Sequence, residues 1–446
     1  MAAKRGLFYA SLNLAGPVFA EETYSLLLGA VVTAVIGRLG PDELTAFTLA
    51  GLVQSSALAI IGVIGTGAAV LAARELGAGN LGLLRQITGH TLALGLVAGA
   101  VLAIAGTKAA GYLPLVLDTD RGVALLAGEL LGPLILFAPP MLMAWLGKSV
   151  LRGMGETRLA FVISAVNNTV TLVATLVLIG AHFTGPAVFG AVWGAGLGSL
   201  ASAASALVIL CCHRHLRLRP HHLYLINPTI VARILRISLP VAWEQVALQL
   251  GFTLYSFELV NVGVKQFAGN QIAQQLEGIP LIIGIGFSAA VLTAVGQSLG
   301  RNLPRVAEQF TRFTAALTIV AMTVVCAVLS LVSEPLNRLF TADPDVIAWS
   351  AVCIKLAILE QPGMATTLIL GNALRGGGDT RWPAYSTMVG MWLVRIPLTY
   401  LFITDQGSSI AVAWLITAGD HFVRAAILAL RFTRCSWNNP RPSWPG

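Results

Sequence analysis

Charged side chains are scarce in this sequence: Asp, Glu, Lys and Arg make up 11% of its 446 residues, whereas hydrophobic residues make up 56%. Soluble domains carry about 25% charged residues, so this scarcity excludes an ordinary soluble domain and indicates a membrane protein. The five cysteines lie mostly in or beside apolar runs, and no disulfide framework is implied. A cluster of catalytic side chains is also missing, since only His421 beside Asp420 comes close, and we expect no enzyme.

Long apolar runs fill most of the chain. A helix of about 20 residues spans a bilayer, and the sequence contains twelve runs of about that length, six in each half. The runs predict helices at 11–36, 46–70, 89–110, 126–147, 159–181, 187–212, 235–260, 270–294, 312–333, 346–370, 383–404 and 408–430.

An internal repeat divides the chain into two copies. The octapeptide LRGMGETR at 151–158 returns as LRGGGDTR at 374–381, a displacement of 223 residues, which is half of the chain length. A repeat at a fixed displacement is the signature of duplicated structural units. The two octapeptides have the composition of tight turns between long apolar runs.

We therefore expect an all-α membrane protein whose 12 transmembrane helices form two six-helix bundles. The first bundle, with a cytoplasmic linker, is assigned to residues 1–222 and the second to residues 223–446. Because six is an even number, both copies enter the membrane in the same direction. We expect a pseudo-two-fold axis along the membrane normal, as in transporters built from parallel repeats.

The first apolar run resembles a signal peptide, because positive charges precede it and a small residue precedes Glu21. Pro17 and Glu21 nevertheless have repeat partners at Pro240 and Glu244. Those partners lie in mid-chain, where no signal peptide can be. We expect the first helix to remain in the mature protein.

Positive charges are distributed unevenly over the predicted loops. With the N-terminus in the cytoplasm, the inner segments hold 20 Lys and Arg residues and the outer loops hold five, which agrees with the positive-inside rule. We expect a multi-pass protein of the plasma (inner) membrane with both termini cytoplasmic. The net charge of +8 is spread over these short inner loops, so we expect no nucleic acid as a partner.

Acidic residues inside the predicted helices are the candidate functional residues, because a carboxylate within a membrane is costly unless it is paired, protonated or facing water. Glu21 and its repeat partner Glu244 lie in the first helix of each copy. The second copy also carries Glu360, and it carries Glu277 where the first copy has Gln54. We expect these four glutamates to line a central cavity, with Glu244 and Glu277 as the coupling pair.

Two further polar residues complete the candidate site. Gln245 is the neutral repeat partner of Glu22, and Asn168 lies on a polar side of the helix predicted at 159–181. Four histidines share the loop between the copies with arginines: His213, His215, His221 and His222. This composition is typical of a solvated basic linker, and we predict no metal site.

Basic residues in the second copy suggest ion pairs. Asp420 and Arg424 are four residues apart, which is ion-pair spacing on a helix. Arg395 is expected either to snorkel or to pair with an acid of the last helix. Lys355 and Glu360 are five residues apart, about 140° around a helix, and should not pair.

The repeat, the two LRGxG[ED]TR turns and the proline-led first helix of each copy resemble the multidrug and toxic compound extrusion (MATE) family of secondary transporters. The resemblance implies two bundles facing each other in a V, a cavity open alternately to either side, and efflux driven by Na⁺ or H⁺. Many members carry an Asp in helix 1 and an Asn and an Asp in helix 5, where this chain has Val32, Thr171 and Thr175. The coupling charge would then come from Glu21 or from the second bundle.

Charges within the predicted helices favour a positively charged guest. They comprise six acids and three bases: Glu21, Glu22, Glu244, Glu277, Glu360 and Asp420, against Lys355, Arg395 and Arg424. We expect an antiporter that exports small organic compounds, cationic or amphipathic, in exchange for Na⁺ or H⁺ by alternating access. It should need no cofactor and act as a monomer in the lipid bilayer. The alternatives are a flippase for anionic lipid-linked precursors, from the same superfamily, and a membrane-embedded enzyme.

Overall fold

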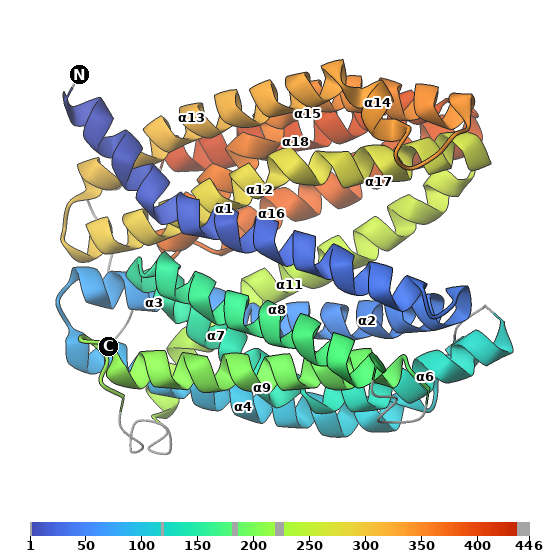
Figure 1. The fold of residues 1–446 in the computed structure, drawn as a ribbon. Helices are drawn as coiled ribbons and strands as arrows, with labels where there is room; N and C mark the ends of the chain where they lie inside the picture. The colour runs from blue at the N-terminus through green and yellow to red at the C-terminus, as the bar shows by residue number, and fades with distance from the viewer. Residues whose placement is uncertain (1, 117–119, 181–185, 219–226, 435–446) are drawn as a thin grey trace. The chain divides into compact units, whose positions relative to one another are not determined.

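The computed structural model describes residues 2–116, 120–180, 186–218 and 227–434, which form helices and turns without a strand (Figure 1). The first copy contains α1 (Ala2–Gly37), α2 (Pro41–Gly62), α3 (Ile64–Gly77), α4 (Leu81–Ala110), α5 (Leu113–Val116), α6 (Arg121–Leu136), α7 (Ala138–Met154), α8 (Thr157–Gly180) and α9 (Phe189–Cys212). The second contains α11 (Pro228–Val260), α12 (Val264–Gly300), α13 (Pro304–Leu331), α14 (Ser333–Asn337), α15 (Pro344–Gly376), α16 (Arg381–Met388), η1 (Val389–Arg395), α17 (Ile396–Thr399), η2 (Tyr400–Asp405) and α18 (Ile410–Arg434).

The spans agree with the predicted fold class. In the described residues, ten helices are long and apolar enough to cross a membrane, and the bent pair α6–α7 supplies an eleventh span. The 33-residue helix α11 is not among them, but it is the repeat counterpart of α1 and takes the place of the sixth span in the second copy. The prediction of an all-α membrane protein is confirmed.

The helices pack into two compact units. Unit 2 comprises residues 20–239, and unit 1 comprises residues 1–19 together with residues 240–446. The boundaries fall inside α1 and α11, close to the repeated prolines Pro17 and Pro240. The contacts thus divide the chain within two helices, whereas the sequence repeat divides it between residues 222 and 223.

Apolar side chains fill the core of each unit. In unit 2, α4, α7, α8 and α9 contribute Leu84, Leu151, Ile163 and Leu210, which are all fully buried. In unit 1, α12, α15 and α18 form a comparable cluster, to which α1 adds Ala15. The start of α1 is therefore a structural part of unit 1.

The repeated octapeptide is a tight turn whose glycines have separate tasks. Gly155 and Gly378 have φ values of 85° and 88°, a left-handed conformation that favours glycine. A Cβ atom on Gly153 or Gly376 would collide with the backbone of α3 or α12, respectively. Gly153 and Gly376 thus permit close helix packing, and Gly155 and Gly378 let the chain turn after the helix.

Two stretches of backbone differ between the copies. In the first copy the span formed by α6 and α7 bends by 54° at Phe137, while its counterpart α15 is continuous. The helix α8 is regular, while its counterpart, residues 381–405, contains the π-helical segments η1 and η2. Pro397 has no N–H to donate, and Ile396 before it donates to the carbonyl oxygen of Met391, five residues back. The proline lies just after η1 and contributes to the local change in helical register.

Candidate functional site

Each unit contains a buried glutamate bound by an arginine of its octapeptide turn. In unit 2, Glu21 of α1 is 3% exposed, and its Oε1 atom lies 2.7 Å from Nη2 of Arg152. The hydroxyl of Ser164 on α8 donates to the same oxygen. We call these three residues the unit 2 clamp. It attaches α1 to α7 and α8.

The unit 1 clamp has the same construction. Nη2 of Arg375 lies 2.7 Å and 2.6 Å from the two carboxylate oxygens of Glu244 on α11. The hydroxyl of Thr387 on α16 donates to Oε1 of Glu244 at 2.9 Å. All three residues stand 223 positions after their counterparts in the unit 2 clamp. The structure therefore places the predicted residues Glu21 and Glu244 in equivalent ion pairs, each within its own unit.

The unit 2 clamp carries one additional charge of each sign. Nζ of Lys148 lies 3.3 Å from Oε1 of Glu21 and donates to Ser164 at 2.7 Å. Glu22 also interacts electrostatically with Lys148. The repeat partners of Lys148 and Glu22 are Gly371 and Gln245, so both charges are missing together from unit 1. Each clamp is thus close to neutral as a whole.

Gln54 and Asn168 bind groups of unit 2. Gln54 donates to the carbonyl oxygen of Leu134 at 2.7 Å, next to the bend between α6 and α7. Asn168 donates to the hydroxyl of Ser25 on α1 at 2.8 Å. The third predicted amide, Gln245, is partly buried on α11. Gln54 therefore satisfies a backbone group at the bend, and Asn168 connects α8 to α1.

The positions where many MATE members carry an Asp in helix 1 and an Asn and an Asp in helix 5 are occupied by packing residues here. Thr175 is fully buried, and a Cβ atom on Gly194 of α9 would collide with it. Thr171 meets Gly198 of α9 in the same way. Close approach over small residues is a common mode of helix packing in membranes. Val32 packs against an apolar cluster, so these three positions bring no charge into unit 2.

Two carboxyl groups meet inside unit 1. Glu277 on α12 and Glu360 on α15 lie within hydrogen-bonding reach of each other. Glu360 is 2% exposed, and Oε1 of Glu277 and Oε2 of Glu360 are buried without a donor among the described residues. When both neighbouring carboxyl groups are ionised, their negative charges repel each other and neither has a hydrogen to donate. We call Glu277 and Glu360 the acid pair. Repulsion between two ionised carboxylates is relieved when a proton or another cation lies between them.

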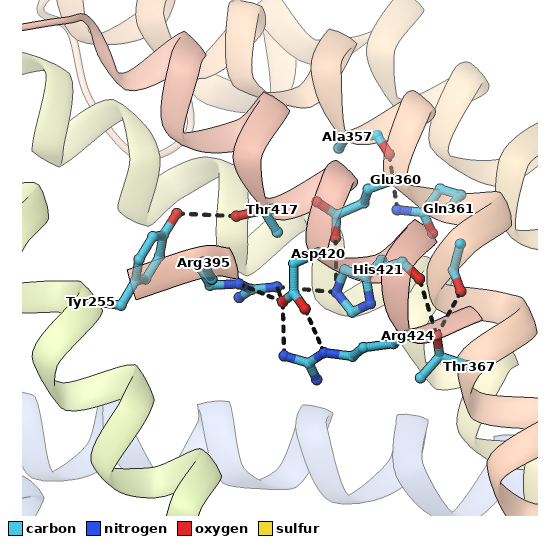
Figure 2. A network of polar contacts seen from close by, with 11 residues as sticks. Tyr255, Ala357, Glu360, Gln361, Thr367, Arg395, Thr417, Asp420, His421 and Arg424 are labelled. Carbon is cyan, nitrogen blue, oxygen red and sulfur yellow. Dashed lines mark hydrogen bonds and ion pairs between the residues drawn. The ribbon is translucent and has the colours of Figure 1, made fainter. Parts of the chain in front are cut away.

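A charged network extends from Glu360 (Figure 2). Asp420 on α18 is fully buried between Arg424, at 2.6 Å, and Arg395 of η1, at 2.8 Å. His421 lies next to them, with Nε2 3.9 Å from Oε1 of Glu360 and 3.3 Å from Nη2 of Arg395. The predicted ion pair of Asp420 with Arg424 is confirmed, and Arg395 pairs with an acid of the last helix.

Packing fixes the position of Arg395. Its guanidinium lies 5.7 Å and 5.5 Å from the ring centroids of Phe252 and Tyr255 on α11, which are cation–π contacts. Tyr255 is held in turn by a 3.2 Å hydrogen bond to Thr417 (Figure 2). A Cβ atom on Gly390 of η1 would collide with Asp420 and Arg424. Phe252 and Tyr255 thus hold the guanidinium of Arg395 in place, and Gly390 leaves room for Asp420 and Arg424.

The first copy has no equivalent of the acid pair and the charged network. The repeat partners of Glu277, Glu360, Arg395, Asp420, His421 and Arg424 are Gln54, Phe137, Leu172, Leu197, Gly198 and Ala201. The clamps, in contrast, are present in both copies. Both copies thus share the clamps, which attach helices to one another. The buried charged region is specific to unit 1.

Sequence reasoning missed the basic and hydroxyl members of the clamps. Arg152 and Arg375 were assigned to loop turns, and Ser164 and Thr387 were not selected. Their signal was nevertheless present, because an Arg and a hydroxyl residue recur at the same displacement as Glu21. In the loop between the copies, His221 and His222 lie outside the described residues, and the described residues contain no cluster of three or more metal-ligating side chains.

Spanning helices with charged groups buried among them define a multi-pass membrane protein, and its relatives identify it as a transporter and not an enzyme. The chain belongs to the MatE family, whose profile matches residues 17–177 and 240–401. It is 24% identical over 430 residues to a probable multidrug resistance protein NorM of Thermotoga maritima, covering 96% of this chain and 92% of that protein. It is 26% identical to the multidrug resistance protein PmpM of Pseudomonas aeruginosa, covering 88% and 84% of the two chains.

Solved structures share the fold. A multidrug resistance MATE family transporter in an outward-facing conformation matches with a TM-score of 0.87 and 18% identity, covering 95% of each chain. A transporter of the MOP superfamily from Pyrococcus furiosus, described as having a binding pocket of reverse polarity, matches with a TM-score of 0.88 and 17% identity over 97% and 96% of the chains.

Proposed function

We propose that this protein is an antiporter that exports organic cations in exchange for H⁺ or Na⁺, and that the acid pair binds the coupling ion. The contact between the carboxyl groups of Glu277 and Glu360 carries the proposal. Such a pair binds one small cation when it is enclosed and can release it on reaching water. The names of NorM and PmpM support multidrug substrates.

The acid pair replaces the coupling pair predicted from the sequence. Glu244 was expected to act with Glu277, but both of its carboxylate oxygens accept from Arg375. An arginine so placed neutralises Glu244 without a transported ion. Glu360 forms no comparable ion pair with an arginine or a lysine among the described residues, and Nε2 of His421, a base only when protonated, lies 3.9 Å away. We therefore assign coupling to Glu277 and Glu360.

The placement of the charges, and not their number, supports a cationic substrate over an anionic one. The predicted count of six acids against three bases left out Lys148, Arg152 and Arg375, and with them the two counts are equal. After that correction, the acid pair is still the group that lacks its own strong base. A flippase for pyrophosphate-bearing precursors would need bases available to the cargo. Arg375, Arg395 and Arg424 each bind a carboxylate instead.

The same proposal includes a setting in the plasma (inner) membrane, with both termini cytoplasmic and the protein acting as a monomer. The uneven distribution of Lys and Arg over the loops supports the orientation. Labelling of single cysteines introduced into the loops of intact cells tests it.

Transport in proteoliposomes tests the coupling. Ethidium serves as the fluorescent organic cation, and Na⁺ and pH gradients are imposed separately. We expect one gradient to drive ethidium transport by the wild type, and Glu277→Gln and Glu360→Gln each to lose the gradient dependence. Glu334→Gln, which changes an exposed acid of α14, is the matched control. Wild-type coupling in both acid-pair variants would reject the proposal.

A further inference from the structure

The charges around the acid pair can be counted because each has a definite partner. Asp420 is already bound by Arg424 through two contacts, Nε to Oδ1 at 2.6 Å and Nη2 to Oδ2 at 2.7 Å. Arg395 adds a second positive charge to the same carboxylate. Asp420 and the two arginines therefore carry one net positive charge. Arg395 also makes two contacts with Asp420, and it is the arginine that acts electrostatically on Glu360, so we count it as the surplus cation.

Within the part of the chain that the structure describes, the remaining groups around the acid pair add no charge. The titratable and charged residues that face it or its neighbours are Tyr255, Glu277, Cys326, Cys353, Glu360, Arg395, Asp420, His421 and Arg424. Tyrosine and cysteine are neutral at physiological pH. His421 is neutral because its Nε2 accepts from Arg395, which can only donate. The Glu244–Arg375 ion pair beside Arg424 is neutral in itself.

The net charge of this buried region is zero when the acid pair holds one monovalent cation. With one proton between Glu277 and Glu360, the pair carries one negative charge, which the surplus positive charge of Arg395 balances. With no proton, the region has one uncompensated negative charge, and with two protons it has one uncompensated positive charge. An uncompensated charge in a membrane interior is strongly disfavoured. A single bound cation is thus the favoured state.

We propose that Arg395 sets the coupling ratio at one monovalent cation per cycle. Its positive charge compensates one of the two acids, so the acid pair binds one cation instead of two. Arg395 is thus a positioning residue for the coupling ion, which it does not bind itself. The inference rests on the proposed function, because it presupposes that the acid pair binds the coupling ion.

The test measures the number of coupling ions per ethidium in proteoliposomes. The membrane potential is held at zero, and the ion gradient that just balances an opposing ethidium gradient gives the ratio. We expect a ratio of one for the wild type and two for Arg395→Gln. The conservative variant Arg395→Lys should return to one. Lys355→Gln removes an exposed charge from the helix that carries Glu360 and should leave the ratio at one.

Changing Asp420 separates charge from structure. Asp420→Asn adds one net positive charge, so both acids can stay ionised and ethidium transport should no longer depend on the ion gradient. Combining Arg395→Gln with Asp420→Asn restores the net charge and should restore a ratio of one. These two variants give opposite expectations even where Arg395→Gln alone does not fold. Loss of coupling in the combined variant would overturn the inference.

Failure of the inference differs from failure of the proposed function. If Glu277→Gln and Glu360→Gln abolish coupling while the wild type, Arg395→Gln and the combined variant share one ratio, the role of Arg395 is wrong and the acid pair stands. If both glutamine variants couple like the wild type, the proposed function itself is wrong.

Discussion

Arg375 and Arg152 are repeat partners, yet Arg375→Gln should destabilise the protein more than Arg152→Gln. Arg375 is the one base that binds Glu244 in the described part of the chain, and the two side chains are 17% and 8% exposed. Glu21 keeps Lys148 at 3.3 Å after Arg152 is removed. Breaking a buried ion pair by removing one partner costs about 3–5 kcal/mol. We expect about 3 kcal/mol for Arg375→Gln and about half of that for Arg152→Gln.

Thermal unfolding of the purified protein in detergent measures this difference. A loss of 1 kcal/mol lowers Tm by about 2–4 °C in a domain of unit 1's size, so Arg375→Gln should lower Tm by about 6–12 °C and Arg152→Gln by about half as much. Adding Gly371→Lys to Arg375→Gln reproduces the lysine of the unit 2 clamp and should recover part of the loss. There is room for that side chain, because a Cβ at Gly371 meets other atoms only at 3.8 Å or more. Equal losses for the two arginines, or no recovery beyond that of Gly371→Lys alone, would refute the reasoning.

Gly390→Ala should reduce ion-coupled ethidium transport and lower stability by about 1–3 kcal/mol, because its Cβ would collide with Asp420. Gly419→Ala on α18, where the added Cβ meets nothing within 4 Å, is the control. Asp343 caps α15, and the backbone N–H of Asp345, which donates to it, lowers its carboxyl pKa below the usual 3.8. The cap should stabilise α15 above pH 3.8 and lose that effect as the pH falls through the lowered pKa. Amide exchange at Asp345 should therefore differ between the wild type and Asp343→Ala at pH 7 and converge in acid.

Helices and repeat were predictable because their signals are local or periodic. The length of each apolar run indicates one span, and a displacement of 223 residues connects the copies. Glu21, Glu244, Glu277 and Glu360 were selected because charge in an apolar helix stands out in the sequence. The ion pair between Asp420 and Arg424 was predictable because helical spacing alone brings the two side chains together.

Partners on different helices could not be derived from spacing. Glu244 and Arg375 are 131 residues apart, and helix geometry alone does not say that they meet. Nothing in the spacing of Glu277 indicates that it meets Glu360 instead of Glu244. Likewise, Pro397 indicates a disturbed helix, but the change of register that carries Arg395 toward Asp420 depends on the packing of η1 against α18.

The place of residues 1–19 in unit 1 affects how the protein is made. Ala15 completes a core whose other members are synthesised more than 250 residues later, and Ser11 reaches Thr314 at 3.2 Å. The amino-terminal segment must therefore wait, unburied by its final neighbours, until the ribosome has produced most of the chain. A gene cut at the midpoint would yield a carboxy-terminal fragment without this segment, so the duplicated halves have become dependent on each other for assembly.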